Sequence, residues 1–191
     1  MGEIRSALEI ALEKTRDVQS DKEGLVRREM EEKGKRLFSR LREEPELDVA
    51  REIDQVERKH RQTVRKGFFD VALANLSLPQ TAEDIAAYDQ IATALQKIVK
   101  DRRTVSQLFD QLKEYMQRYL DDRQRLIETL RERFSQAMQA QEEAGGRSSG
   151  RRPDPASHPE FANALNQNLQ QLQQQYSGVL DQVRLELERL F

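Results

Sequence analysis

Two glycines in the stretch AGGRSSGRRPDPASHPE have the spacing of a phosphate-binding loop, because four residues separate Gly145 from Gly150. Such a loop holds phosphates with its backbone amides, and it needs a Lys and then a Ser or Thr directly after the second glycine. Arg151 and Arg152 stand there instead, and a helix rather than a strand is expected before the loop. The Ser, Pro and Asp residues that follow are typical of a connector. We therefore interpret residues 144–157 as a flexible linker and expect no nucleotide or other cofactor.

A second candidate site is the Glu-x-x-His pair formed by Glu57 and His60. On a helix this spacing places both side chains on one face, as in di-iron carboxylate bundles, but such sites need a second copy of the motif and further carboxylates. The other histidine, His158, has Pro155 at the position of the glutamate. The sequence therefore predicts no metal site, and His60 is interpreted as a polar residue of a helix seam.

A third candidate is a basic helix face that could contact phosphates. Acidic residues interrupt and flank it, and such mixed rows are more often solvated surface, so nucleic-acid binding stays an alternative. The face comprises Arg51, Arg58, Arg61 and Arg65.

The composition limits the classes of function further. Charged residues make up 35% of the 191 residues, yet the net charge is only -2, so no bulk attraction to a polyanion is expected. Charges near the N-terminus and the absence of a long apolar run predict neither a signal peptide nor a membrane span, which favours the cytoplasm. The chain has no cysteine, which excludes disulfides and thiolate chemistry.

The elements that must position any site are helices, because apolar residues recur at spacings of three and four. A first helix is expected over 2–19, with a break at the capping box of Ser20 and Glu23. A second helix runs to Pro45, and a third lies between Pro45 and Pro79. A fourth begins at the capping box of TAED, residues 81–84.

The fourth helix carries the most regular pattern. Eleven of fourteen heptad-like positions from 91 to 137 are apolar, and no Gly or Pro lies between Pro79 and Gly145, so one uninterrupted spine helix is predicted over about 81–143. A last helix follows at 158–191, with Ser157 expected as its cap. Its outer face is rich in Gln and Asn.

The opening residues MGEIRSALEIALEKTRDV and the following EEKGKRL resemble a group of small, helical, uncharacterised bacterial proteins. The resemblance covers about the first forty residues. It implies a bacterial, cytoplasmic setting and carries no activity, cofactor or functional residue.

The sequence predicts an all-α fold, an elongated antiparallel helical bundle with coiled-coil-like long helices. Residues 1–143 would form the bundle with its spine, and 158–191 would pack on it. We expect a non-enzymatic scaffold, adaptor or stalk-like subunit that binds a protein partner or a second copy, and we expect no small-molecule substrate. A nucleic-acid-associated protein is the alternative function, and a bundle enzyme comes third.

The last helix is shorter than the spine, so an uncovered apolar section should serve as an interface. We expect this interface either at the end of the spine around Leu126, Leu130 and Phe134 or at the patch around Phe68 and Val71, whichever the last helix leaves bare.

Overall fold

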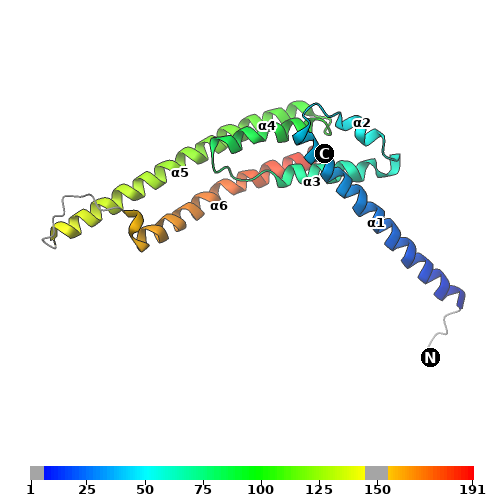
Figure 1. Cartoon of the computed structure of the whole chain (residues 1–191), viewed down its shortest axis with the longest axis horizontal. Coiled ribbons are helices and arrows are strands. Elements are labelled where there is room, and N and C mark those ends of the chain that lie inside the picture. Colours follow the sequence, from blue (N-terminus) through cyan, green and yellow to red (C-terminus); the bar gives the residue numbers. More distant parts are fainter. Residues whose placement is uncertain (1–6, 145–154) are drawn as a thin grey trace. The chain divides into compact units, whose positions relative to one another are not determined.

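The computed structural model describes residues 7–144 and 155–191, and the side chains of 22–144, 155, 156 and 158–191. The described residues form helices joined by turns, and they contain no strand (Figure 1), which confirms the all-α class. The elements are α1 (Ala7–Glu43), α2 (Val49–Asp54), the short 3-10 turn η1 (Arg58–His60), α3 (Arg61–Ala74), α4 (Ala82–Gln96), α5 (Arg102–Ala144), a second such turn η2 (Pro155–Ser157) and α6 (Pro159–Leu190).

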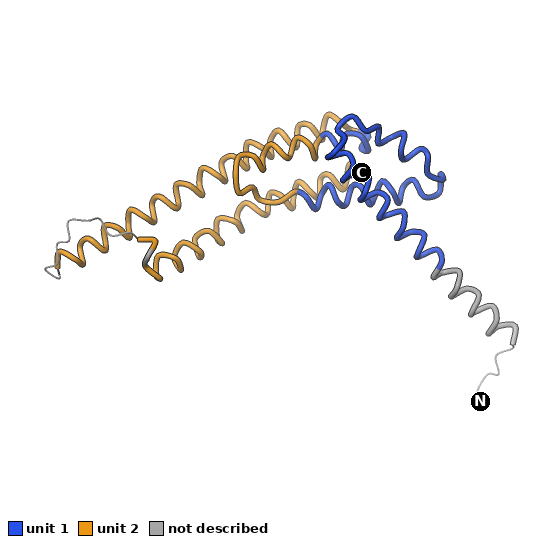
Figure 2. Tube along the Cα trace, viewed as in Figure 1, with its two compact units in different colours: residues 1–75, 93–100 blue, residues 76–92, 101–191 orange. Residues whose placement is uncertain are grey.

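The chain divides into two compact units (Figure 2). Unit 1 comprises residues 1–75 and 93–100, and unit 2 comprises residues 76–92 and 101–191. Most of α4 therefore belongs to unit 2, while its last turn belongs to unit 1. The predicted boundary at 143/144 is not the place where the units divide. The predicted linker lies largely at 145–154, outside the described residues.

In unit 1, α1 crosses α3 so closely that each helix has a glycine at the contact. A Cβ on Gly34 would come within 2.1 Å of the Val64 carbonyl oxygen, and one on Gly67 within 2.1 Å of the Glu31 carbonyl oxygen. Next to the crossing, the rings of Phe38 and Phe68 meet edge to face with centroids 5.4 Å apart. Any larger residue at either glycine would push the two backbones apart.

Three predicted helix boundaries are wrong. The helix α1 continues through Ser20 without a break, because neither Gly nor Pro precedes that capping box and continuing the helix keeps its backbone hydrogen bonds. The expected third helix, from Pro45 to Pro79, is divided into α2, η1 and α3. The cap of α6 is His158, whose Nδ1 accepts a hydrogen bond from the amide of Glu160 (3.4 Å), rather than Ser157.

The predicted uninterrupted spine over 81–143 is also wrong, since α4 ends at Gln96 and α5 begins at Arg102. On the α5 side, Asp101 caps the start of a new helix. Its carboxylate accepts hydrogen bonds from the Thr104 amide (3.0 Å) and the Thr104 hydroxyl (2.6 Å). On the other side, Ile98 and Val99 are buried, so the turn is held in the apolar interior of unit 1.

The start of α4 follows its predicted capping box. The Asp84 carboxylate accepts hydrogen bonds from the amides of Gln80 (2.8 Å) and Thr81 (2.9 Å). These backbone bonds stabilise the charged carboxylate and lower the pKa of Asp84 below its ordinary value. Pro79 cannot continue a preceding helix, so here the capping box marks a true helix start.

Candidate protein interface

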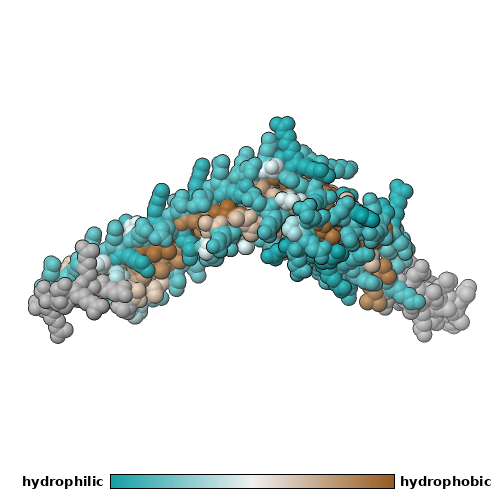
Figure 3. All heavy atoms as spheres, turned by 45° about the horizontal axis from the view of Figure 1, so that its top comes forward, coloured by the Kyte–Doolittle hydropathy of each residue, from teal (hydrophilic) through white to brown (hydrophobic). Residues whose placement is uncertain are grey.

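The helices α5 and α6 pair antiparallel along unit 2. Two ring contacts fix their register: Phe134 meets Phe161 with centroids 5.4 Å apart, and Tyr119 meets Tyr176 with centroids 5.2 Å apart. Figure 3 shows apolar surface along this helix pair, bordered by hydrophilic side chains. The pairing follows from the heptad-like spacing of apolar residues in both helices, which gives each a stripe facing the other.

Residues 76–92 add a third layer to the part of this pair that lies nearest the start of α5. Lys113 of α5 forms an ion pair with Asp89 of α4 (2.6 Å), and the Arg123 guanidinium donates to the Gln80 carbonyl oxygen (3.3 Å). On α6, Arg184 donates to the carbonyl oxygen of Leu76. Beyond Arg123, α5 is accompanied by α6 and η2.

A cluster of tyrosines lies where the third layer ends. The Tyr176 hydroxyl donates to the Asp122 carboxylate (2.6 Å), and its ring centroid lies 4.8 Å from that of Tyr115. Burial, followed by the bond to Asp122, raises the pKa of Tyr176 to about 12. The buried Tyr119 hydroxyl makes no hydrogen bond with any described residue. These rings pack the two helices together.

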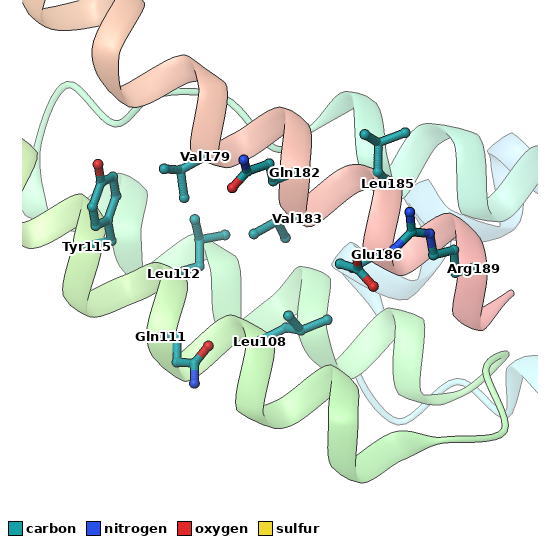
Figure 4. A pocket seen from close by; sticks show the side chains of 10 residues that line it. All are labelled: Leu108, Gln111, Leu112, Tyr115, Val179, Gln182, Val183, Leu185, Glu186 and Arg189. Atoms are coloured by element: carbon teal, nitrogen blue, oxygen red, sulfur yellow. Dashed lines mark hydrogen bonds and ion pairs between the residues drawn. The ribbon is translucent and has the colours of Figure 1, made fainter.

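An open groove of about 550 Å³ runs between α5 and α6 beside this cluster (Figure 4). Apolar side chains form most of its lining, and Leu185 at its rim is 54% exposed. The charged lining residues are Glu186 and Arg189, which form an ion pair with each other. The lining comprises Leu108, Gln111, Leu112, Tyr115, Val179, Gln182, Val183, Leu185, Glu186 and Arg189. Such a surface suits an apolar side chain of a partner better than a reacting polar group.

The two alternative interface patches lie in different units. Phe68 is fully buried in unit 1, so it is core there, and Val71 beside it is half-buried. In unit 2, Leu130 is only 8% exposed, whereas Leu126 and Phe134 are half-buried on the α5–α6 seam. Two of the five, Phe68 and Leu130, are therefore intramolecular core.

The four predicted basic residues do not share one helix, since Arg51 lies in α2, Arg58 in η1, and the other two in α3. Arg61 forms an ion pair with Asp54 (2.7 Å), and Arg65 donates to the carbonyl oxygen of Ile98 (2.9 Å). Two of the four guanidinium groups are thus engaged within unit 1, and the four residues do not form one face of a single helix.

The Glu-x-x-His pair lies at the 3-10 turn η1 instead of on the expected α-helix, and the His60 amide donates to the Glu57 carbonyl oxygen (2.8 Å). Glu57 precedes η1 and forms an ion pair with Lys59 (3.1 Å), which lowers the pKa of the Glu57 carboxyl. His60 follows at the end of η1. Across the described residues, no three His, Cys, Asp or Glu side chains are grouped so that they could hold a metal ion.

The groove is the feature that sequence reasoning missed. Its signal was present in the last helix, where Glu186 occupies a seam position and the neighbouring Leu185 lies off the seam. An apolar residue beside a charged seam position indicates surface that is apolar without being core. Among the described helices, none is long and apolar enough to cross a membrane.

Comparison with known proteins places the chain in a family without assigning it an activity. A family model described as a family of unknown function (DUF6657) matches residues 50–189, a range that includes the groove and all but the last residue of the α5–α6 pair. Residues 1–49 lie outside the matched range. No curated protein and no solved structure matches the chain. Because the match covers well over half of the sequence, the chain belongs to this family of unknown function (DUF6657).

Proposed function

We propose that the chain is a non-enzymatic helical scaffold or adaptor that acts through protein–protein contacts, in the bacterial cytoplasm that the resemblance of its first residues implies. The observation that carries the proposal is the open apolar groove with Leu185 exposed at its rim. A large apolar side chain that stays in water costs free energy until a partner covers it. Exposed apolar surface with a polar border is typical of a binding site for another protein.

The partner that fits this groove is an amphipathic helix. Two antiparallel helices form its walls, and a third helix can lay apolar residues spaced three and four apart between them. Leu108, Leu112 and Val179 offer the apolar floor, while the Glu186–Arg189 pair offers one charge of each sign at the edge. A partner helix with Leu or Ile anchors and mixed flanking charges would therefore be complementary.

The test uses two exposed leucines as a matched pair. Leu185 lines the groove, and Leu25, which is 64% exposed on α1, does not. Because the chain has no cysteine, a cysteine placed at either position gives a unique attachment point for a photocrosslinker. We expect position 185 to crosslink to a helical segment of one partner in native cells, and position 25 not to reach that segment.

Substitution then checks that the groove is used. Leu185→Glu should abolish co-purification of the crosslinked partner, while Leu25→Glu should leave it unchanged, because a buried charge in an apolar contact is strongly unfavourable. Equal recovery of the partner with both variants would refute the groove as the binding site. Nucleic-acid binding that falls steeply with salt and is lost on Arg51→Ala with Arg58→Ala would support the alternative function instead.

A further inference from the structure

The half of the α5–α6 pair farthest from α4 leaves its apolar seam partly open. We call this section the distal hairpin: residues 124–144 of α5 with residues 159–175 of α6. In its seam Leu130 and Phe161 are buried. Seven further seam residues are half-buried although they follow the same spacing as the core of unit 2: Leu126, Ile127, Phe134, Met138, Leu165, Leu169 and Leu172.

The α6 side of this hairpin is unusual in its charge. From Phe161 to Leu180 the helix contains no Asp, Glu, Lys or Arg, and its exposed positions are mainly Gln and Asn. In a chain that is 35% charged, a solvated helix face is expected to carry charges. From residue 161 on, the open seam is therefore bordered on one side by uncharged residues, mainly Gln and Asn.

We propose that the distal hairpin binds the distal hairpin of a second copy of this chain, and that the two hairpins together form a four-helix bundle. In a two-fold symmetric contact, residues near the axis face their own copies, so a charged residue would meet the same charge. A Gln or Asn side chain carries both a donor and an acceptor, so it can form hydrogen bonds with its own copy. The uncharged face of α6 is thus suited to a second copy.

The area is sufficient for such a contact. The α5 part has 21 residues and is about 30 Å long, the α6 part has 17 residues and is about 25 Å long at 1.5 Å per residue, and each helix is about 10 Å wide. Each copy would contribute on the order of 550 Å², and the pair about 1,100 Å², which is just above the roughly 1,000 Å² expected of a specific interface. Closing the bundle would also bury the seven seam residues, as the third layer does elsewhere in unit 2.

The experiment places charges beside the seam without changing the seam itself. The helical phase of α6 places Gln171 and Gln175 on one flank of the leucine seam. It places Gln167 and Gln174 on the outer face of the helix, which points away from the seam. All four side chains are exposed. The test variant is Gln171→Glu with Gln175→Glu, and the control is Gln167→Glu with Gln174→Glu, which adds the same charge to the same helix.

We expect the full chain to sediment as a dimer at micromolar concentration in analytical ultracentrifugation. The test variant should weaken the dimer at least about tenfold, because like charges would meet across the interface, and the control should leave its dissociation constant within about threefold. A second test variant, Asn166→Asp with Gln173→Glu, probes the other side of the seam, and circular dichroism checks that helicity is retained. A monomer at every concentration, or equal weakening by the control, would overturn the proposal.

This inference deepens the proposed scaffold role, and the two can fail separately because they use different surfaces. A monomeric chain that still crosslinks to a partner from Leu185 would overturn the dimer and leave the groove intact. A dimer that responds to the Gln171 and Gln175 variant, but crosslinks to nothing from Leu185, would overturn the groove partner and leave the dimer.

Discussion

Unit 2 contains two sections built from the same two helices. In the first section, α5 and α6 are accompanied by α4, and residues such as Phe109, Leu112 and Met116 are at most 1% exposed. In the second, the distal hairpin, residues at equivalent spacings such as Leu126 and Leu169 are half-buried. Leucines continue at heptad-like spacing into the second section, although Arg123 and Arg133 occupy two of its positions. The third helix accompanies only the first section, which is consistent with its deeper burial.

This comparison shows what an apolar heptad pattern does and does not predict. The pattern fixes which face of a helix turns toward its neighbours, because residues spaced three and four apart share one side. It does not fix how many neighbours are present. A seam that is complete inside one chain and a seam that awaits a second copy have the same sequence signature.

The largest expected effect comes from truncating one phenylalanine in each section. Phe109→Ala should lower the free energy of unfolding by about 3–5 kcal/mol, because it leaves a cavity in a fully packed core. Phe134→Ala, at the half-buried contact with Phe161, should cost roughly 1–2 kcal/mol, since less apolar surface is buried there. Urea unfolding at low protein concentration measures both.

The same pair of variants also tests the second copy. Where the protein is dimeric, Phe134→Ala should cost more than in the monomer, whereas the cost of Phe109→Ala should not depend on protein concentration. Equal losses for the two variants in the monomer would mean that the distal seam is already covered within one chain, and the distinction between the sections would fail.

A smaller effect is expected at the boundary between the sections, where Tyr176 donates to Asp122. Tyr176→Phe should cost about 0.5–1.5 kcal/mol, the usual net value of one hydrogen bond. The pKa of Tyr176 is raised from 10.0 to about 12, so its contribution to stability is complete below pH 10 and is lost as the pH rises toward 12. Alkaline unfolding should therefore be less steep in the variant.

Asp122→Asn separates the two causes of that shift. Removing the carboxylate should bring the pKa of Tyr176 down, but burial, the larger cause, should keep it above 10.0. Tyr88 is the internal control: burial, followed by the charge of Asp84, raises its pKa to about 12, and Asp122 is not among the causes. An ultraviolet titration of tyrosine ionisation resolves the two, and an unchanged Tyr176 would show that Asp122 does not influence it.

The helical class could be predicted because it depends on local periodicity, whereas the helix boundaries depend on competition between signals. At Thr81, a capping box follows Pro79 and begins a helix. At Ser20, no Gly or Pro directly precedes the same pattern, and α1 continues through it. No Gly or Pro lies at the break before α5, so the local sequence pattern did not predict it. It rests on the Asp101 cap and on the burial of Ile98 and Val99, and the burial is long-range information that a local pattern does not contain.

The site was less predictable for the same reason. Phe68 was expected at an interface because its helix has a dense apolar patch, yet the close crossing at Gly34 and Gly67 brings α1 over it. Leu185 lies off the seam of its helix, so the periodicity that located the core gave it no role.

The smallest expected effect concerns the ion pair between Lys113 and Asp89, which joins α5 to α4 in the three-helix section. A double-mutant cycle with Lys113→Met and Asp89→Asn should give a coupling energy of about 0.2–1 kcal/mol, because the Asp89 side chain is 62% exposed and such pairs are screened by water and salt. Asp110 also pairs with Lys113 (3.2 Å), so loss of Asp89 leaves the ammonium with a partner. The bonds to both carboxylates raise the pKa of Lys113 above 10.5, so the contribution is complete below that pH and is lost as the pH rises through the raised value.

A coupling above about 2 kcal/mol, well beyond the range of exposed pairs, would mean that this ion pair, rather than apolar burial, holds α4 in place. In that case the number of helices around the seam would no longer explain why the two sections differ.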